Sequence, residues 1–220
     1  MAAPDTPISP LITLAASYGD AEMQSWCRAL FGFDAQLASI VLTAREPMLA
    51  QIRLQWWHDV IGKPPLQRPS ANPVLAGLLV PEAAGLNLRE VLAPAIRGWE
   101  AALDFEEDGA LDDFAKGRGR VMQAFHVLAP QAEAEELAII GECWALWDLA
   151  RCHRPSAALH TALASVDVST LASIRLPRRL RPLSIIARAV QLDIARGQMD
   201  RPWGTPGLFG ALVWHGLTGR

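Results

Sequence analysis

Apolar residues recur at spacings of three and four along most of the chain, which is the pattern of amphipathic helices. After Asp20, a residue type that often caps helix N-termini, the residues Met23, Trp26, Cys27 and Leu30 form such a stripe. Sustained alternation rich in Val, Ile and Thr is missing, and so is an Asn-Gly or Asp-Gly turn between apolar runs. The pattern predicts an all-α fold of eight to ten helices in a single domain spanning residues 1–220.

Capping residues, prolines and glycines predict where these helices begin and end. A helix from Glu46-Pro47 to Gly62 is expected to bury Leu49, Ile52, Trp56 and Val60, and one from Gln131 to His153 is expected to be the longest. One further helix is expected to begin at Asp20, and another to begin within the acidic stretch Asp104–Asp113, after a loop, and to continue to Leu128. The remaining expected helices span Asp34–Ala44, Asn72–Pro81, Asn87–Leu103, Ser156–Ala164, Pro182–Arg196 and Thr205–Leu217.

The composition indicates a large hydrophobic core in which tryptophan is the most frequent aromatic residue. Of 220 residues, 51% are hydrophobic and 20% charged, which excludes a disordered chain. There are 8 Trp against 6 Phe and 1 Tyr. A net charge of −3 removes the basic field that nucleic-acid binding needs, so no nucleic acid partner is expected.

The chain shows no sign of a membrane span or a secretion signal. Charged residues and prolines interrupt every apolar stretch well before the roughly 20 residues that a spanning helix needs. The N-terminus has Asp5 and no basic residue before the uncharged segment 6–19, unlike a signal peptide. Cys27, Cys143 and Cys152 are widely spaced, which indicates buried, reduced thiols in a cytoplasmic protein.

Three local patterns could carry chemistry, and each has a plainer interpretation. Asp148 and Cys152 share a helix face, but zinc needs three or four ligands, so no metal is predicted. The segment Gly117–Arg120, with arginines at 118 and 120, could present guanidinium groups to a phosphate, or its glycines could serve close helix packing. A basic cluster could contact an anionic lipid surface or a partner, or be a solvated turn: Arg175, Arg178, Arg179 and Arg181.

Several segments resemble the squalene/phytoene synthase family. The Trp-Trp helix of that family is matched by Pro47–Asp59, which contains Arg53, Trp56 and Trp57. The helix carrying its second aspartate-rich motif is matched by Gly141–Arg151. Weaker similarity lies at Leu30–Phe33, Phe114–Gly119 and Leu176–Leu183, so that the likeness covers most of the chain from about Ala15 to Ala195.

The resemblance implies an isoprenoid-synthase-like helical bundle, shortened at the C-terminus, and enzymes of the family join two prenyl diphosphates using magnesium held by two aspartate-rich motifs. The first motif aligns here with Ala38 and Ser39, which offer no carboxylate. In the second motif Asp148 and Arg151 match, whereas Ala145 and Cys152 replace the glutamine and the closing aspartate. Because magnesium is held by carboxylates and phosphates, this loss favours a non-catalytic protein.

The resemblance leaves three hypotheses open. The first is a non-catalytic member that binds a protein partner, of the type that assembles respiratory complex I, without cofactor and with peripheral contact to the inner membrane. The second is a prenyltransferase with a diverged magnesium site, and the third is a prenyl-lipid binding protein. A ligand or diphosphate pocket would be formed by Arg53, Trp57, Arg118, Asp148 and Arg151.

Four tryptophans fall on the two helices that would face such a pocket. Trp56 and Trp57 are adjacent and cannot both point inward, whereas Trp144 and Trp147 are three apart and share a helix face. We predict that large indole rings partly occupy the space that an active enzyme leaves for prenyl chains.

Overall fold

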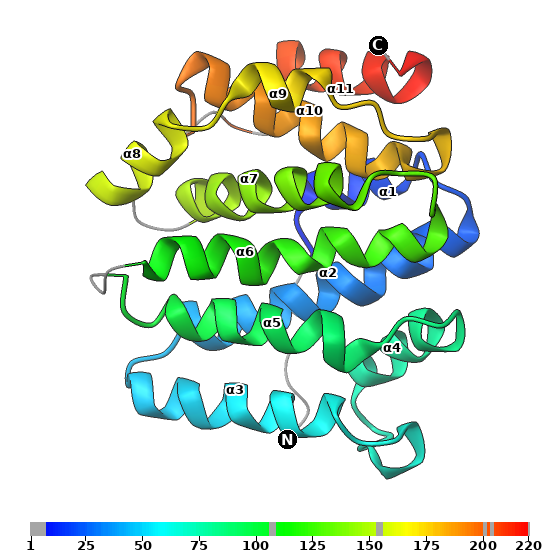
Figure 1. Ribbon diagram of the computed structural model, residues 1–220, viewed down its shortest axis with the longest axis vertical. Helices are drawn as coiled ribbons and strands as arrows, with labels where there is room; N and C mark the ends of the chain where they lie inside the picture. Colours follow the sequence, from blue (N-terminus) through cyan, green and yellow to red (C-terminus); the bar gives the residue numbers. More distant parts are fainter. Residues whose placement is uncertain (1–7, 106–108, 153–155, 200–201, 203–204, 220) are drawn as a thin grey trace.

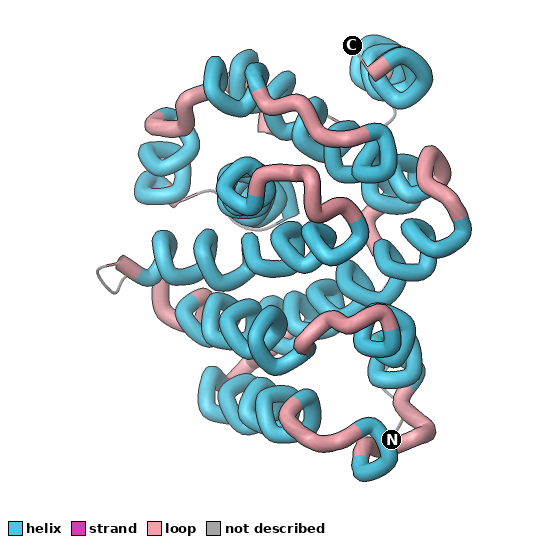
Figure 2. Tube along the Cα trace, turned by 45° about the vertical axis from the view of Figure 1, so that its right-hand side comes forward, coloured by secondary structure: helices cyan, strands magenta, loops and turns pink. Residues whose placement is uncertain are grey.

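A computed structural model describes residues 8–105, 109–152, 156–199, 202 and 205–219. The described part of the chain contains eleven α-helices joined by loops and short 3₁₀ turns, and none of its residues forms a strand (Figure 2). The predicted all-α fold is therefore confirmed.

The helices follow one another with short connections. They are α1 (Pro10–Ala16), α2 (Ala21–Leu42), α3 (Pro47–Ile61), α4 (Pro73–Ala83), α5 (Leu88–Ala101), α6 (Ala110–Gln123), α7 (Ala134–Cys152), α8 (Ala157–Ala164), α9 (Val168–Ser173), α10 (Arg181–Arg196) and α11 (Pro206–Thr218). Short 3₁₀ turns lie at Pro65–Gln67, Ala124–Leu128 and Arg178–Leu180.

Helix caps were the most reliable local signal. The side chains of Asp20, Asn87 and Ser156 accept hydrogen bonds from the backbone N–H groups of Met23, Glu90 and Leu159, as N-caps do. The predicted break before Asp34 was wrong, because α2 runs through it for 22 residues and is longer than the 19-residue α7. The two helices that sequence reasoning missed, α1 and α9, are only 7 and 6 residues long, too short to show a helical period.

Helices α5, α6 and α7 lie side by side in chain order and form the middle of the bundle (Figure 1). Helix α3 packs against α5 at one end, and α10 packs against α7 towards the other. Helix α2 crosses the middle helices and contacts α3, α4, α5 and α6. Helix α11 packs against α10 at the end of the molecule opposite α3 (Figure 1).

Glycines allow α6 to approach both of its neighbours closely. A methyl group at Gly117 would lie 2.8 Å from the Cα of Gly98 on α5, and one at Gly141 on α7 would lie 2.8 Å from the Cα of Gly119. Such contacts are too short for any side chain. The packing interpretation of the Gly117–Arg120 segment is therefore confirmed.

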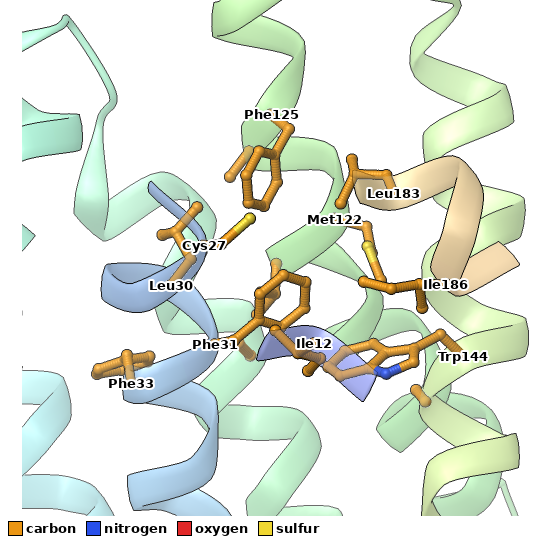
Figure 3. Packing of buried hydrophobic residues seen from close by; sticks show 14 of the residues in the cluster. Ile12, Cys27, Leu30, Phe31, Phe33, Met122, Phe125, Trp144, Leu183 and Ile186 are labelled. Atoms are coloured by element: carbon orange, nitrogen blue, oxygen red, sulfur yellow. The ribbon is translucent and has the colours of Figure 1, made fainter. Parts of the chain in front are cut away.

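Aromatic side chains fill the core between these helices. Trp144 of α7 meets Phe31 of α2 edge-on at 5.4 Å between ring centroids, and Phe31 stacks on Phe125 at 5.9 Å (Figure 3). Trp26, Trp99 and Trp147 are also fully buried. With Trp57, which is 4% exposed, five of the tryptophans thus serve as large core residues.

The predicted inward face of α3 was wrong. Val60 is buried, but Leu49, Ile52 and Trp56 are exposed, and Ala50, Leu54 and Trp57 face the core instead. Both sets have helical spacing, because the helix carries apolar residues on two sides. Spacing alone could not show which side packs. The prediction that only one of Trp56 and Trp57 points inward is confirmed.

Candidate functional site

An ionic cluster joins α2 to two of the middle helices, α6 and α7. Asp34 of α2, Arg118 of α6 and Asp148 of α7 meet between these helices, and both Asp34 and Arg118 are 3% exposed. Charged residues are almost never so buried unless they are paired. We call these three residues the Arg118 cluster.

The guanidinium group of Arg118 bridges the two carboxylates. Its Nε and Nη2 donate to Oδ1 and Oδ2 of Asp34 at 3.0 and 2.7 Å. Nη2 also donates to Oδ2 of Asp148 at 2.6 Å, and Nη1 donates to the carbonyl oxygen of Ala145 at 3.3 Å. The fork-on-carboxylate geometry with Asp34 is the strongest form of this pairing.

Two indole rings enclose the guanidinium group. Its central carbon lies 4.8 Å from the ring centroid of Trp99 and 4.2 Å from that of Trp144, both within the range of cation–π attraction. Trp99 additionally donates its Nε1 hydrogen to Asp34 at 2.9 Å. Arg118 and Asp34 are therefore shielded from water as well as charge-paired, whereas Asp148 is partly buried, with its side chain 14% exposed.

The electrostatics keep Arg118 charged. Burial by itself would lower the pKa of Arg118, but the negative charges of Asp34 and Asp148 more than offset this and raise it above its ordinary value. A divalent cation could bridge the two carboxylates only by displacing the guanidinium group that lies between them. The arrangement therefore links three helices through ion pairs and does not form an open metal site.

A second buried pair lies one turn further along α7. Arg151 donates from Nη1 to Oδ2 of Asp193 on α10 at 2.8 Å, and Trp147 donates to the same oxygen at 3.3 Å. Asp193 is completely buried. This pair ties α7 to α10, as the Arg118 cluster ties α7 to α6 and α2.

The structure brings together two of the five predicted pocket residues. Arg118 and Asp148 are in direct contact, whereas Arg151 belongs to the neighbouring pair with Asp193. Arg53 is exposed on α3, and Trp57 packs edge-on against Phe33 at 5.4 Å between ring centroids. Neither of these two residues takes part in the Arg118 cluster.

The positions of the degenerate aspartate motifs lie near this cluster. Ala38 and Ser39 are half-buried on α2, about one turn beyond Asp34. The side chain of Cys152 lies outside the described residues. Asp34 itself, which does not belong to the aligned motif, is the residue of α2 that reaches Arg118.

Sequence reasoning missed Asp34, Trp99 and Asp193 as members of these clusters. The sequence contains a signal for the two aspartates, because each is a single carboxylate on an otherwise apolar helix face. Leu37 lies three residues after Asp34, and Val190 lies three residues before Asp193. Such a position indicates a buried partner of opposite charge. The identity of that partner depends on the tertiary fold and could not be read from the chain.

The described thiols are buried and unpaired, as predicted for Cys27 and Cys143. Burial raises the pKa of Cys27 to about 12 and that of Cys143 to about 11. Because the thiolate is the reactive form, both thiols are poor nucleophiles and metal ligands at neutral pH.

Comparison of the chain with protein-family models, with curated proteins and with solved structures finds no match. The resemblance to the squalene/phytoene synthase family therefore stays a prediction. Among the described helices, none combines the length and the apolar character needed to cross a bilayer.

Proposed function

We propose that this protein acts by binding a partner protein and does not catalyse a reaction. The observation that carries the proposal is the Arg118 cluster, in which one guanidinium group occupies the carboxylates of both Asp34 and Asp148. A prenyl-diphosphate enzyme needs such carboxylates to hold magnesium against the leaving diphosphate. Here they hold helices together instead.

The outward face of α3 supplies a surface that suits a protein partner. Met48 and Ile52 are 70% and 60% exposed, and Leu49 and Trp56 lie on the same side of the helix. Charged residues of both signs, Arg53 and Asp59 among them, border these side chains. An apolar centre with a mixed polar rim and a tryptophan anchor is typical of protein–protein interfaces.

The specific form of the proposal is a factor for respiratory complex I assembly, built on an isoprenoid-synthase-like fold. Its support is the sequence resemblance together with the absence of carboxylates at Ala38 and Ser39. The partner would be a subunit of that complex, met at the inner membrane. No cofactor is required for this role.

Enzymatic assay tests the non-catalytic part. The purified protein is incubated at high concentration with farnesyl or geranylgeranyl diphosphate and magnesium, and diphosphate release is measured. We expect none above a protein-free control. Release that disappears in an Asp148→Asn variant, with folding checked by circular dichroism, would overturn the proposal in favour of a diverged prenyltransferase.

Deletion of the gene tests the assembly role. We expect less assembled NADH dehydrogenase in the deletion strain, restored by the wild-type chain but not by an Ile52→Ser/Trp56→Ser variant that folds normally. A Glu90→Gln variant, changed at an exposed position on α5, serves as the matched control and should restore assembly. Unchanged assembly after deletion would exclude this role.

A further inference from the structure

Helix α11 is apolar over most of its surface, with His215 and Thr218 as its polar side chains, although half of it faces outwards. Its sequence, PGLFGALVWHGLT, contains no Asp, Glu, Lys or Arg. Leu208, Leu212 and Gly216 are buried, the helix packs against α10, and Gly216 lies against the ring of Tyr18. A helix this apolar is normally enclosed by protein or by lipid, so its outer face calls for an explanation.

The outer face carries large side chains at helical spacing. Phe209, Trp214 and Leu217 are 49%, 64% and 71% exposed. At 3.6 residues per turn they lie within one half of the helix circumference, opposite Leu208 and Leu212. Gly210 follows Phe209 and Gly207 lies in the first turn, and both have open space around them. The face is therefore a continuous apolar strip.

Arginines are concentrated beside this strip. Residues 168–199 contain 6 Arg and a single acidic residue, Asp193, in a protein of net charge −3. Asp193 is buried against Arg151, and Arg179 pairs with Glu22. Arg175 and Arg178 are exposed, which leaves the surface next to α11 basic.

The strip and the arginines adjoin each other in space. Arg178, Arg179 and Arg181 line a surface pocket together with Leu217 and Thr218 at the end of α11, and Asp20, whose carboxylate caps α2, lines the same pocket. Arg175 and Arg188 line a second pocket with His215 and Gly219. These arginines therefore border the last turns of α11.

We propose that α11 and the bordering arginines form a docking surface for an anionic lipid bilayer. The apolar strip enters the boundary between headgroups and acyl chains, where tryptophan is favoured, and the arginines contact lipid phosphates. Thirteen residues span about 20 Å at 1.5 Å per residue, too short to cross a bilayer, so α11 lies in the plane of the surface.

Charge favours this occupant over a second copy of the chain. In a twofold dimer, the same patch of each subunit meets its copy, so the arginines bordering α11 would face one another. A bilayer rich in anionic phospholipid presents the opposite charge. This inference stands on α11 and does not depend on the proposed function, which concerns α3 and the Arg118 cluster.

Vesicle flotation with the full chain tests the proposal. Vesicles of phosphatidylcholine alone are compared with vesicles that also contain phosphatidylglycerol. We expect binding to the anionic vesicles, weakened at high salt. An Arg175→Gln/Arg178→Gln variant should bind about 25-fold more weakly, since each basic residue contributes about fivefold. A Phe209→Ser/Trp214→Ser variant should lose at least about tenfold.

The Ile52→Ser/Trp56→Ser variant is the matched control, because it removes similar exposed side chains from the opposite end of the molecule. It should bind vesicles like the wild type. Failure of the folded wild-type protein to bind anionic vesicles would overturn the proposal, as would an equal loss in the control. Sedimentation showing a dimer that the Phe209→Ser/Trp214→Ser variant abolishes, without vesicle binding, would assign the strip to a second copy instead.

Discussion

The Arg118 cluster and the outer face of α11 both reverse the usual distribution of residues, in opposite senses. In the cluster, charged side chains are buried and each meets groups of opposite charge. On α11, aromatic and aliphatic side chains are exposed. The comparison separates two kinds of effect: changes in the cluster should alter the stability of the fold, and changes on α11 should alter what the protein binds.

The largest effect is expected from Arg118→Leu. The substitution leaves two carboxylates in the core without their cation, and breaking a buried ion pair from one side costs about 3–5 kcal/mol. With two carboxylates involved, we expect a loss of about 5 kcal/mol in the free energy of unfolding, measured by urea denaturation. Arg53→Leu on the exposed face of α3 is the matched control and should change stability by less than about 0.5 kcal/mol.

A triple variant distinguishes stranded charge from lost packing. Replacing all three charged residues with apolar ones of similar size, as Asp34→Leu/Arg118→Met/Asp148→Leu, removes the unpaired charges, and such exchanges are often neutral or stabilising. We expect it to recover most of the loss. If the triple variant is no more stable than Arg118→Leu, the loss in Arg118→Leu comes from lost packing and not from unpaired carboxylates.

Trp144→Ala should cause the next largest loss in the free energy of unfolding. The ring is buried against Phe31 and covers the guanidinium group of Arg118, so its removal leaves a cavity and takes away a cation–π contact. We expect a loss of about 4 kcal/mol, by the same denaturation measurement. Trp56→Ala, at a residue that is 42% exposed, should cost clearly less, about 1 kcal/mol. Equal losses for the two variants would show that the buried contacts of Trp144 do not stabilise the fold more than those of Trp56.

Gly141→Ala tests the close approach of α6 and α7. The added methyl group would meet the backbone of Gly119, and overpacking of this kind costs about 1–3 kcal/mol. We expect a loss of about 2 kcal/mol in the free energy of unfolding. Gly210→Ala on α11 has open space around it and should be neutral or stabilising by up to about 1 kcal/mol, because alanine favours helix. A stabilising effect at Gly141 would contradict the packing described above.

Alkaline pH provides a smaller test of burial at Cys27. Since the pKa of this thiol is raised from 9.0 to about 12, the folded state keeps a proton that the unfolded chain releases, and stability is lost as the pH rises from 9 towards 12. Between pH 8 and 10, this group should contribute a loss of about 1 kcal/mol. A Cys27→Ala variant should show a correspondingly shallower decline. An identical decline in both proteins would mean that the thiol is more accessible than its position indicates.

The smallest change in stability is expected for substitutions on the outer face of α11. Phe209→Ser/Trp214→Ser alters only exposed side chains, so the free energy of unfolding should stay within about 0.5 kcal/mol. The same variant is expected to lose most vesicle binding. A loss of several kcal/mol in stability would show that the outer face of α11 is part of the core.

The sequence predicted the local features better than the contacts between helices. Caps such as Asp20 and Asn87 act through neighbouring backbone groups, so they are visible in the sequence. The break expected at Asp34 was wrong because the same residue type can cap a helix or pair with a distant arginine. The pairing of Arg118 with Asp34, 84 positions away in the chain, follows only from the crossing of α2 and α6.

The glycine contacts of α6 also bear on how the chain folds. Gly98 with Gly117, and Gly119 with Gly141, fix the closest approaches within α5, α6 and α7. These helices are consecutive in sequence and form the most extensive helix contacts of the described chain. Contacts between neighbours in sequence require little loop closure and form quickly. We expect these three helices to make up the folding nucleus. Asp34 would then dock onto an arginine whose position on α6 is already set.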